Sequence, residues 1–179
     1  MHDAPKQGRS DRVHDLHFVT GAAGVGKSTF GRDLARKLQA VVLDSDTVTE
    51  PVVRAGLAAA EMDPEDRDSP TYKRFFRDAV YECLFQTASE NLTHLPVVII
   101  GPFTRELTDD TWPEKLAMRF GVRPTIWFLE CSDAARRERM ERRGNPRDRG
   151  KLLDWQHHVA AAPPTQPAFQ VRRVDTSTN

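Results

Sequence analysis

The sequence lacks the features of secreted and membrane-bound chains. It has only two cysteines, Cys83 in a helical pattern and Cys131 just after a strand pattern, so no structural disulfide is expected. Residues 1–15 are polar and contain no apolar run of signal-peptide length. We therefore expect a cytoplasmic protein with no membrane association, whose residues 1–15 form a flexible tail.

An excess of charge of one sign is also missing. The chain has 26 Lys and Arg residues against 26 Asp and Glu residues, which gives a formal net charge of zero. Proteins that bind nucleic acid through its phosphates usually carry a basic excess. The balance therefore disfavours nucleic acid as a partner. At 179 residues, the chain fits one domain, over 16–179, in a monomer or a homodimer.

Strand and helix patterns alternate after the tail. Strands are expected at 16–20, 40–43, 96–101, 125–129 and 169–174. Helices are expected at 27–38, from 51 onward, and at 71–92, 109–120, 133–143 and 152–160. The run PVVIIG at 96–101 is apolar throughout, as in a strand buried on both faces of a parallel sheet. These patterns predict an α/β fold with a five-stranded, mostly parallel sheet and an active site at the carboxyl ends of its strands.

A phosphate-binding loop follows the first strand. Gly21-x-x-x-x-Gly26-Lys27-Ser28 matches the Walker A pattern and lies between a strand and a helix, the context that this motif requires. Backbone N–H groups of such a loop surround the phosphates of a nucleotide, the lysine reaches the outer phosphates, and the hydroxyl ligates Mg²⁺. We expect ATP and Mg²⁺ to bind here, with contacts from Gly21, Ala22, Ala23, Gly24, Val25, Gly26, Lys27, Ser28 and Thr29.

Two motifs that commonly accompany such a loop are absent. Mechanical ATPases usually end a later apolar strand with an acidic pair, whereas here Gly101 occupies that position. Guanine-reading switches carry an Asn-Lys-x-Asp tetrapeptide, which does not occur in the chain. The sequence therefore disfavours a motor and a switch.

Two carboxylates instead end the second strand. Asp44 and Asp46 are two residues apart in VVLDSDTVTE, a spacing that points both side chains to one face of extended backbone. One could organise Mg²⁺ while the other accepts the proton of an attacking hydroxyl. Asp46 is the better candidate for the general base. A loop whose Asp and Ser residues only cap the next helix is the alternative.

A basic segment at 136–151 contains eight basic and three acidic residues. Arg139 and Arg143 lie on one helix face, and a basic helix that leads into a Gly- and Pro-bounded loop is a suitable lid over a phosphoryl group. An arginine supplied in this way accelerates phosphoryl transfer. We rank Arg143 first and Arg139 second, with Arg147 as an open alternative, while other arginines form a solvated helix face.

These three clusters, in this order, resemble the small P-loop kinases of the nucleoside-monophosphate-kinase superfamily. Shikimate kinase, gluconate kinase and chloramphenicol phosphotransferase are the most similar types, together with actinobacterial kinases described as AAA family ATPases. The resemblance implies a P-loop NTPase three-layer sandwich with strand order 2-3-1-4-5 and a basic lid. It also gives Asp44 a role with magnesium and Asp46 a contact with the substrate hydroxyl.

The residues that bind the acceptor are less defined. GPFTRE, at 101–106, takes the place of a glycine-rich substrate loop of shikimate kinase, but Pro102 and Phe103 replace its glycines. Arg105 in this loop could pair with a carboxylate or phosphate of the acceptor, or with Glu106 on the surface. Arg74 and Arg77 could line the acceptor pocket or form an exposed helix edge.

The leading hypothesis is an ATP-dependent phosphotransferase that moves the γ-phosphoryl group to a hydroxyl of a small metabolite or antibiotic. One alternative is a kinase of nucleic-acid ends or nucleotide-sugars, similar to polynucleotide kinases and zeta-type toxins. Another is a nucleotide-binding interaction module with little turnover.

Overall fold

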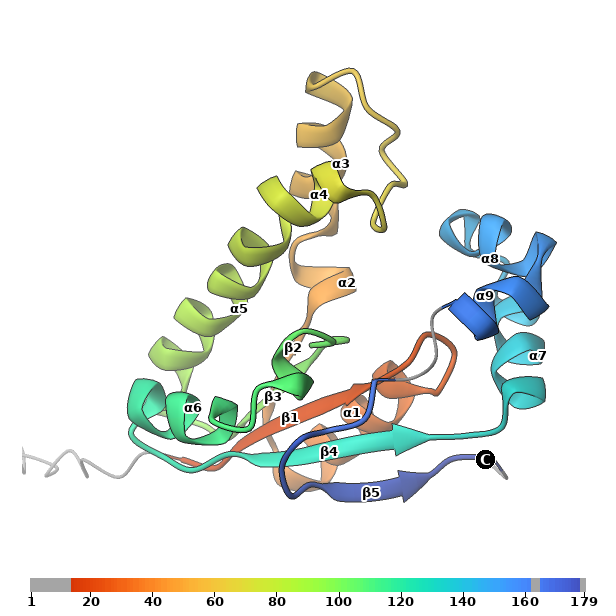
Figure 1. Cartoon of the computed structure of the whole chain (residues 1–179). Coiled ribbons are helices and arrows are strands. Elements are labelled where there is room, and N and C mark those ends of the chain that lie inside the picture. Colours follow the sequence, from red (N-terminus) through yellow and green to blue (C-terminus); the bar gives the residue numbers. More distant parts are fainter. Residues whose placement is uncertain (1–13, 162–164, 178–179) are drawn as a thin grey trace, which may run out of the picture.

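The computed structural model describes residues 14–161 and 165–177, and most of the expected tail at 1–15 lies outside them. A five-stranded sheet forms the centre of the molecule (Figure 1). Its strands are β1 (Leu16–Gly21), β2 (Val41–Asp44), β3 (Val97–Ile100), β4 (Thr125–Glu130) and β5 (Arg172–Asp175). The strand order is β2-β3-β1-β4-β5, and every pair is parallel. The expected P-loop NTPase sandwich and its strand order are therefore confirmed.

Helices cover both faces and the carboxyl edge of the sheet (Figure 1). They are α1 (Lys27–Leu38), α2 (Ser45–Val48), α3 (Glu50–Ala59), α4 (Pro70–Phe75), α5 (Arg77–Asn91), α6 (Trp112–Phe120), α7 (Asp133–Arg143), α8 (Arg149–Leu153) and α9 (Trp155–Ala161). Two 3-10 turns, Glu106–Thr108 and Pro146–Asp148, lie between them. In Figure 1, α7 to α9 stand across a gap from α3 and α4.

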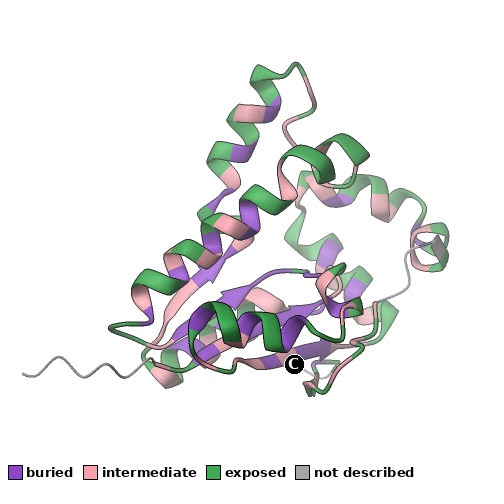
Figure 2. Cartoon of the chain, turned by 60° about the vertical axis from the view of Figure 1, so that its left-hand side comes forward, coloured by how far each residue is buried: buried purple, intermediate pink, exposed green. Residues whose placement is uncertain are grey.

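Alternate side chains of the strands enter two cores. Phe18, Ile99 and Phe128 pack with the helices α3, α5 and α6, whereas Val19 and Ile100 pack with α1 on the opposite face. Period-two alternation explains this division, since neighbouring strand residues point to opposite faces. Both faces are covered, as expected for a parallel sheet. Figure 2 shows the strands as the most continuously buried part of the chain.

The structure corrects three sequence-based boundaries. The helix expected at 71–92 is broken at Phe76 into α4 and α5, and Phe76 packs its ring against Gly56 of α3. The helix expected at 152–160 is broken at Asp154, whose backbone is not helical, into α8 and α9. Strand β5 spans Arg172–Asp175, three residues later than the start expected at 169.

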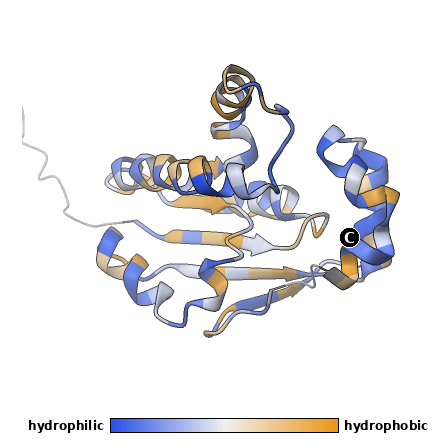
Figure 3. Ribbon diagram, turned by 45° about the horizontal axis from the view of Figure 1, so that its top comes forward, coloured by the Kyte–Doolittle hydropathy of each residue, from blue (hydrophilic) through white to orange (hydrophobic). Residues whose placement is uncertain are grey.

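Two further expectations concern disulfide bonds and membrane association. Both cysteines are free thiols. Among the described residues, no helix is long and apolar enough to cross a membrane. Figure 3 shows that α7 to α9 are mostly hydrophilic, in contrast to the central strands.

Candidate active site

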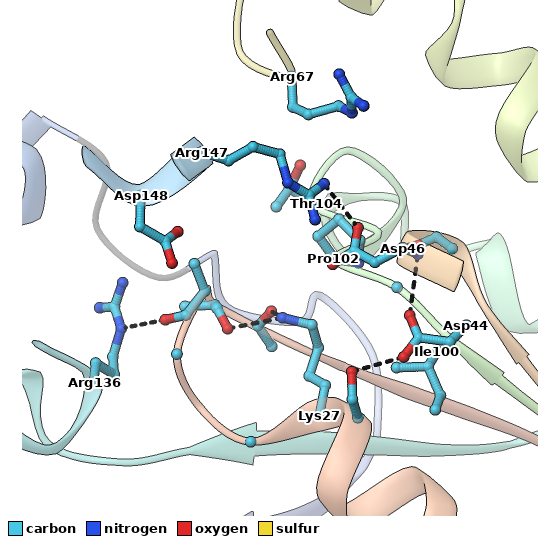
Figure 4. Close-up of a pocket in the computed structure, with 18 of the residues that line it drawn as sticks. Lys27, Asp44, Asp46, Arg67, Ile100, Pro102, Thr104, Arg136, Arg147 and Asp148 are labelled. Atoms are coloured by element: carbon cyan, nitrogen blue, oxygen red, sulfur yellow. Dashed lines mark hydrogen bonds and ion pairs between the residues drawn. The ribbon is translucent and has the colours of Figure 1, made fainter. Parts of the chain in front are cut away.

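A cavity of about 1080 Å³ opens at the carboxyl ends of the strands. Its main walls are the loop after β1 with the start of α1, the end of β2 with α2 and α3, the helices α4 and α5 with the loop before them, the loop after β3, and the lid from α7 to α9. Phe128, Thr165 and Thr176 also line it. Figure 4 shows Lys27, Asp44, Asp46 and Arg147 facing one another across this cavity. This is the edge of an α/β sheet where ligands are expected to bind.

The phosphate-binding loop is packed tightly against its neighbours. Gly24 has a φ of 81°, and a Cβ on it would lie 2.8 Å from the carbonyl oxygen of Arg136. A residue with a side chain would therefore strain the backbone and also clash with α7. The Arg136 guanidinium, which is almost fully buried, donates a 3.0 Å hydrogen bond to the Ala23 carbonyl. The lid helix therefore braces the loop.

Lys27 lies at the bottom of the cavity. Its Nζ donates 2.9 Å hydrogen bonds to the carbonyl oxygens of Gly21 and Ala22 (Figure 4). Burial lowers the pKa of Lys27 to about 8, an effect that nearby Asp46 opposes and Arg143 strengthens. A buried ammonium group in a glycine-rich loop at the start of a helix is suited to a highly charged anion, and the triphosphate of ATP fits this chemistry.

Ser28 and Asp44 form a second part of the site. The Ser28 hydroxyl donates a 2.7 Å hydrogen bond to Asp44 Oδ2, and Asp44 is only 4% exposed. Asp44 Oδ1 also accepts the backbone N–H of Asp46 at 3.1 Å, which fixes the carboxylate at the start of α2. A hydroxyl and a carboxylate next to a phosphate loop are suitable oxygen ligands for Mg²⁺. Both residues lie where the sequence predicts them.

Asp46 faces the opening of the cavity. Its side chain is 61% exposed, and Oδ1 lies 3.3 Å from Nη1 of Arg147, which comes from the lid (Figure 4). It lies on the first turn of α2, two residues after the buried Asp44. Since Asp46 is exposed within the cavity, a substrate hydroxyl can approach it.

The structure places the two predicted lid arginines on the cavity wall, but each has protein partners. Arg143 makes a bidentate pair with Asp148, at 2.5 and 2.8 Å, and the Asp148 side chain is 3% exposed. Arg139 Nη1 lies 3.1 Å from the Thr176 hydroxyl, and its other amino group contacts the Thr176 carbonyl. Arg147 is the lid arginine that reaches the carboxylates of the site. Sequence spacing missed the Arg143 pair because the chain turns back at 144–148.

The acceptor side contains one of the three predicted arginines. Arg77 lines the cavity, pairs with Glu106 at 2.7 Å and lies over the Tyr81 ring at 5.3 Å. Arg105 and Arg74 are not among the lining residues. Arg105 is exposed and pairs with Asp78 at 2.7 Å and with Glu106 at 3.1 Å, while Arg74 lies over Phe75. The geometry corrects the expected position of these two side chains.

The sequence did not single out several residues that build this acceptor side. Tyr72, Tyr81 and Arg67 line the cavity, and the Arg67 guanidinium lies 5.4 Å from the centre of the Tyr72 ring. The Arg67 Nη2 atom lies 3.0 Å from Glu50 Oε2, although without the angle of a hydrogen bond. Tyrosines that recur in an amphipathic helix are a weak signal, since most pack into a core.

The loop after β3 has an unusual backbone. Phe103 has a φ of 43° and is fully buried, and its N–H donates a 3.2 Å hydrogen bond to the Tyr81 hydroxyl. Burial raises the pKa of Tyr81 to about 12, so the hydroxyl stays neutral. The Thr20 hydroxyl donates to the Pro102 carbonyl at 2.8 Å. These bonds fix a loop that presents Thr104 to the cavity.

Comparisons with known proteins agree with this geometry. A family model described as an AAA domain matches residues 16–162 of the chain. A solved protein from Chloroflexus aurantiacus is 19% identical, with 93% of this chain and 90% of that chain covered and a TM-score of 0.66. A gluconokinase from Sinorhizobium meliloti 1021 is 18% identical, with 96% and 86% covered and a TM-score of 0.52.

The APS kinase CysC of Mycobacterium tuberculosis, solved in complex with AMPPNP and APS, is 20% identical. The alignment covers 94% of this chain and 91% of that chain, with a TM-score of 0.55. No curated protein matches the sequence with significance. At such identities these structures show that the chain shares their fold, as the sequence predicts.

Proposed function

This chain belongs to the AAA domain family, and we propose that within this family it is an ATP-dependent phosphotransferase that moves the γ-phosphoryl group to a hydroxyl of a small molecule. One observation supports the proposal above the others. Lys27, the Ser28–Asp44 pair and Asp46 line one cavity. Lys27 and Ser28 follow β1, whereas Asp44 and Asp46 lie at and just after the end of β2, so that Ser28 and Asp44 meet across 16 residues of sequence. A protein that only bound nucleotide would need the first two features but not an exposed carboxylate beside them.

Each residue has a distinct part in the proposed reaction. Lys27 holds the outer phosphates, and the backbone amides of the loop orient them. Ser28 and Asp44 would hold Mg²⁺, which neutralises charge on the phosphates when it is bound. The acceptor oxygen forms a bond to the γ-phosphorus, the bond from this phosphorus to the β–γ bridging oxygen breaks, and ADP leaves. Asp46 takes the proton of the acceptor hydroxyl.

The cavity supports a small acceptor rather than a polymer. It is formed on one side by α3 to α5 and on the other by the lid, and side chains of both connect across it, as Arg147 does with Glu50 and Lys151 with Asp68. A volume of about 1080 Å³ must admit both the nucleotide and the acceptor. Gluconokinase and APS kinase are names of proteins with the same fold, and neither substrate is assigned to this chain. We place the protein in the cytoplasm, where ATP and Mg²⁺ are supplied.

Release of ADP from ATP in the presence of pooled acceptors tests the proposed function. The pools are sugar acids, amino alcohols, hydroxy amino acids, nucleosides, common antibiotics and a 5′-hydroxyl oligonucleotide, each with Mg²⁺. We expect one small-molecule pool to raise turnover above the rate without acceptor, and Lys27→Ala to remove the increase. If only the oligonucleotide raised turnover, or if no pool did while ATP still bound, the proposal would be wrong.

A further inference from the structure

Five lid arginines line the cavity, and they differ in their partners. Arg142 is exposed and lies 3.8 Å from Glu138 of the same helix. Arg136 is buried against the Ala23 carbonyl and Asp133, and Arg143 is paired with the buried Asp148. Arg139 contacts Thr176. These contacts hold the lid together and pack it against the loops after β1 and β5. Arg147 is different, because its partners are carboxylates of the cavity itself.

Arg147 is held in position by its backbone. Asn145 Oδ1 accepts the Arg147 N–H at 3.0 Å, and Pro146 begins the 3-10 turn that carries the residue. The side chain is 17% exposed and extends across the cavity towards α2 and α3. The short turn therefore aims one guanidinium group from the lid at the opposite wall.

The contacts of Arg147 with this wall are long. Nη1 lies 3.3 Å from Asp46 Oδ1 and 3.4 Å from Glu50 Oε2, whereas charge-assisted N–H···O bonds are typically about 2.7–2.9 Å. One cation is therefore shared loosely between two carboxylates. Asp46 is largely exposed, which further weakens the pair. Such a pairing can be exchanged for a stronger anion.

The carboxylates on the wall formed by α2 and α3 do not depend on Arg147 alone for compensation of their charge. Glu50 keeps a second cation, because Arg67 Nη2 lies 3.0 Å from the same Oε2 atom. Departure of Arg147 would leave Glu50 paired and would leave Asp46 as an exposed carboxylate. While Arg147 is in place, its guanidinium lies 3.3 Å from Asp46 Oδ1 and offsets the negative charge with which this carboxylate would accept the proton of a substrate hydroxyl.

We propose that Arg147 exchanges partners: it pairs with Asp46 and Glu50 when the phosphate-binding loop holds no nucleotide, and with the terminal phosphoryl group when ATP is bound. This inference rests on the proposed function. The exchange makes Arg147, rather than Arg143, the lid arginine that touches the transferred group. It also frees Asp46 from the charge of Arg147 only after the nucleotide has bound, so productive binding follows the order nucleotide first, acceptor second.

Nucleotide binding to the full chain tests the exchange without any acceptor. The dissociation constants of Mg·AMPPNP and Mg·ADP are measured by calorimetry for wild type, Arg147→Gln, the double variant Asp46→Asn with Glu50→Gln, and the triple variant. Arg147→Gln should weaken AMPPNP binding about 10-fold to 100-fold, with ADP changed less than about twofold, because one charged hydrogen bond to the terminal phosphate is lost.

The double variant should change AMPPNP affinity in the opposite direction. Removing the carboxylates that compete for Arg147 should tighten AMPPNP binding by about threefold or more, a gain that unfolding cannot produce. This gain should vanish in the triple variant, which has no Arg147 to release. Arg137→Gln is the control, since Arg137 pairs with Glu141 on the exposed side of α7 and should leave both constants unchanged.

Two results would overturn the exchange alone. One is equal weakening of ADP and AMPPNP by Arg147→Gln, and the other is a gain from carboxylate removal that persists in the triple variant, which would be a general charge effect. A wild-type protein that bound neither nucleotide would overturn the proposed function, and the exchange with it.

Discussion

The Ser28 hydroxyl donates a 2.7 Å hydrogen bond to Asp44 Oδ2, which joins the first turn of α1 to the end of β2. The two residues are 16 positions apart in the sequence but adjacent in space, because β1 and β2 end at the same edge of a parallel sheet. Asp44 is almost fully buried. Its chemistry suits a magnesium ion at the phosphates.

Asp44→Asn should therefore remove most of the magnesium dependence of nucleotide binding. An amide is a neutral and weaker ligand than a carboxylate, so the wild-type gain in AMPPNP affinity on adding Mg²⁺ should fall by about tenfold. Calorimetry with Mg²⁺ and with EDTA measures this gain. Glu82→Gln, at an exposed pair with Arg119, is the matched control and should keep the full gain. An unchanged gain in Asp44→Asn would exclude this residue from the metal site.

Nucleotide affinity should depend on pH through Lys27. Its pKa of about 8 in the free protein means that the ammonium is charged below pH 8 and loses its proton above it. Bound phosphates favour the charged form, so binding takes up a proton above pH 8 and affinity falls by up to about tenfold per pH unit as the pH rises. Lys27→Arg, which stays charged, should abolish this slope between pH 8 and 10. Equal slopes for both proteins would argue against the assignment.

The Tyr81 hydroxyl should stabilise the loop after β3. Tyr81→Phe leaves the buried Phe103 N–H without a partner, at a cost of about 1–3 kcal/mol in the free energy of unfolding. Urea denaturation measures this loss. Tyr72→Phe is a matched control, because the Tyr72 hydroxyl makes no hydrogen bond within the described residues, and it should change stability by less than about 0.5 kcal/mol. Similar losses in the two variants would mean that the Phe103 bond does not hold the loop.

A second pH effect should come from His17 of β1. Burial lowers its pKa below 6.5, an effect that Asp15 opposes and Arg172 strengthens, and its Nδ1 accepts the Trp127 Nε1–H at 3.3 Å. The unfolded chain then binds more protons than the folded chain below pH 6.5. Stability is complete above this pH and is lost as the pH falls through the folded-state pKa.

His17→Asn should reduce this loss, measured as the change in unfolding free energy between pH 7 and pH 5. His94→Asn, at an exposed position, should behave as wild type. The assignment would be contradicted if His17→Asn kept the full wild-type slope.

The sequence predicted the parts of the site that depend on local chain geometry. The spacing of Gly21, Gly26, Lys27 and Ser28 determines the conformation of a short loop. Because this loop follows a strand of a parallel sheet, its side chains lie at the carboxyl edge, where the site is expected. The prediction that Asp44 and Asp46 share one face of extended backbone is wrong, because α2 begins at Ser45. Asp44 is buried against Ser28, whereas Asp46 lies in the first turn of α2 and faces the lid.

Side-chain pairs that form outside regular helix or strand spacing could not be predicted. Arg143 and Asp148 are five residues apart, outside helical pair spacing, and meet because the chain turns after Gly144. Arg105 lies in the loop of the cavity, but the left-handed backbone of the neighbouring Phe103 directs the chain so that Arg105 pairs with Asp78 at the surface. Gly144 and Pro146 indicate that the chain turns there, but no pattern in the sequence indicates which side chains meet after either turn.

Transfer of label from [γ-³²P]ATP to the acceptor found by the ADP-release screen, by wild type and Asp46→Asn, tests the central claim most directly. The proposed mechanism predicts labelled acceptor with wild type and a loss of transfer of about 100-fold or more in Asp46→Asn, since general-base catalysis contributes roughly 10²–10⁴-fold. AMPPNP affinity should be retained in the variant. Full transfer by Asp46→Asn would contradict the role of Asp46, and the absence of any labelled acceptor with wild type would contradict the phosphotransferase itself.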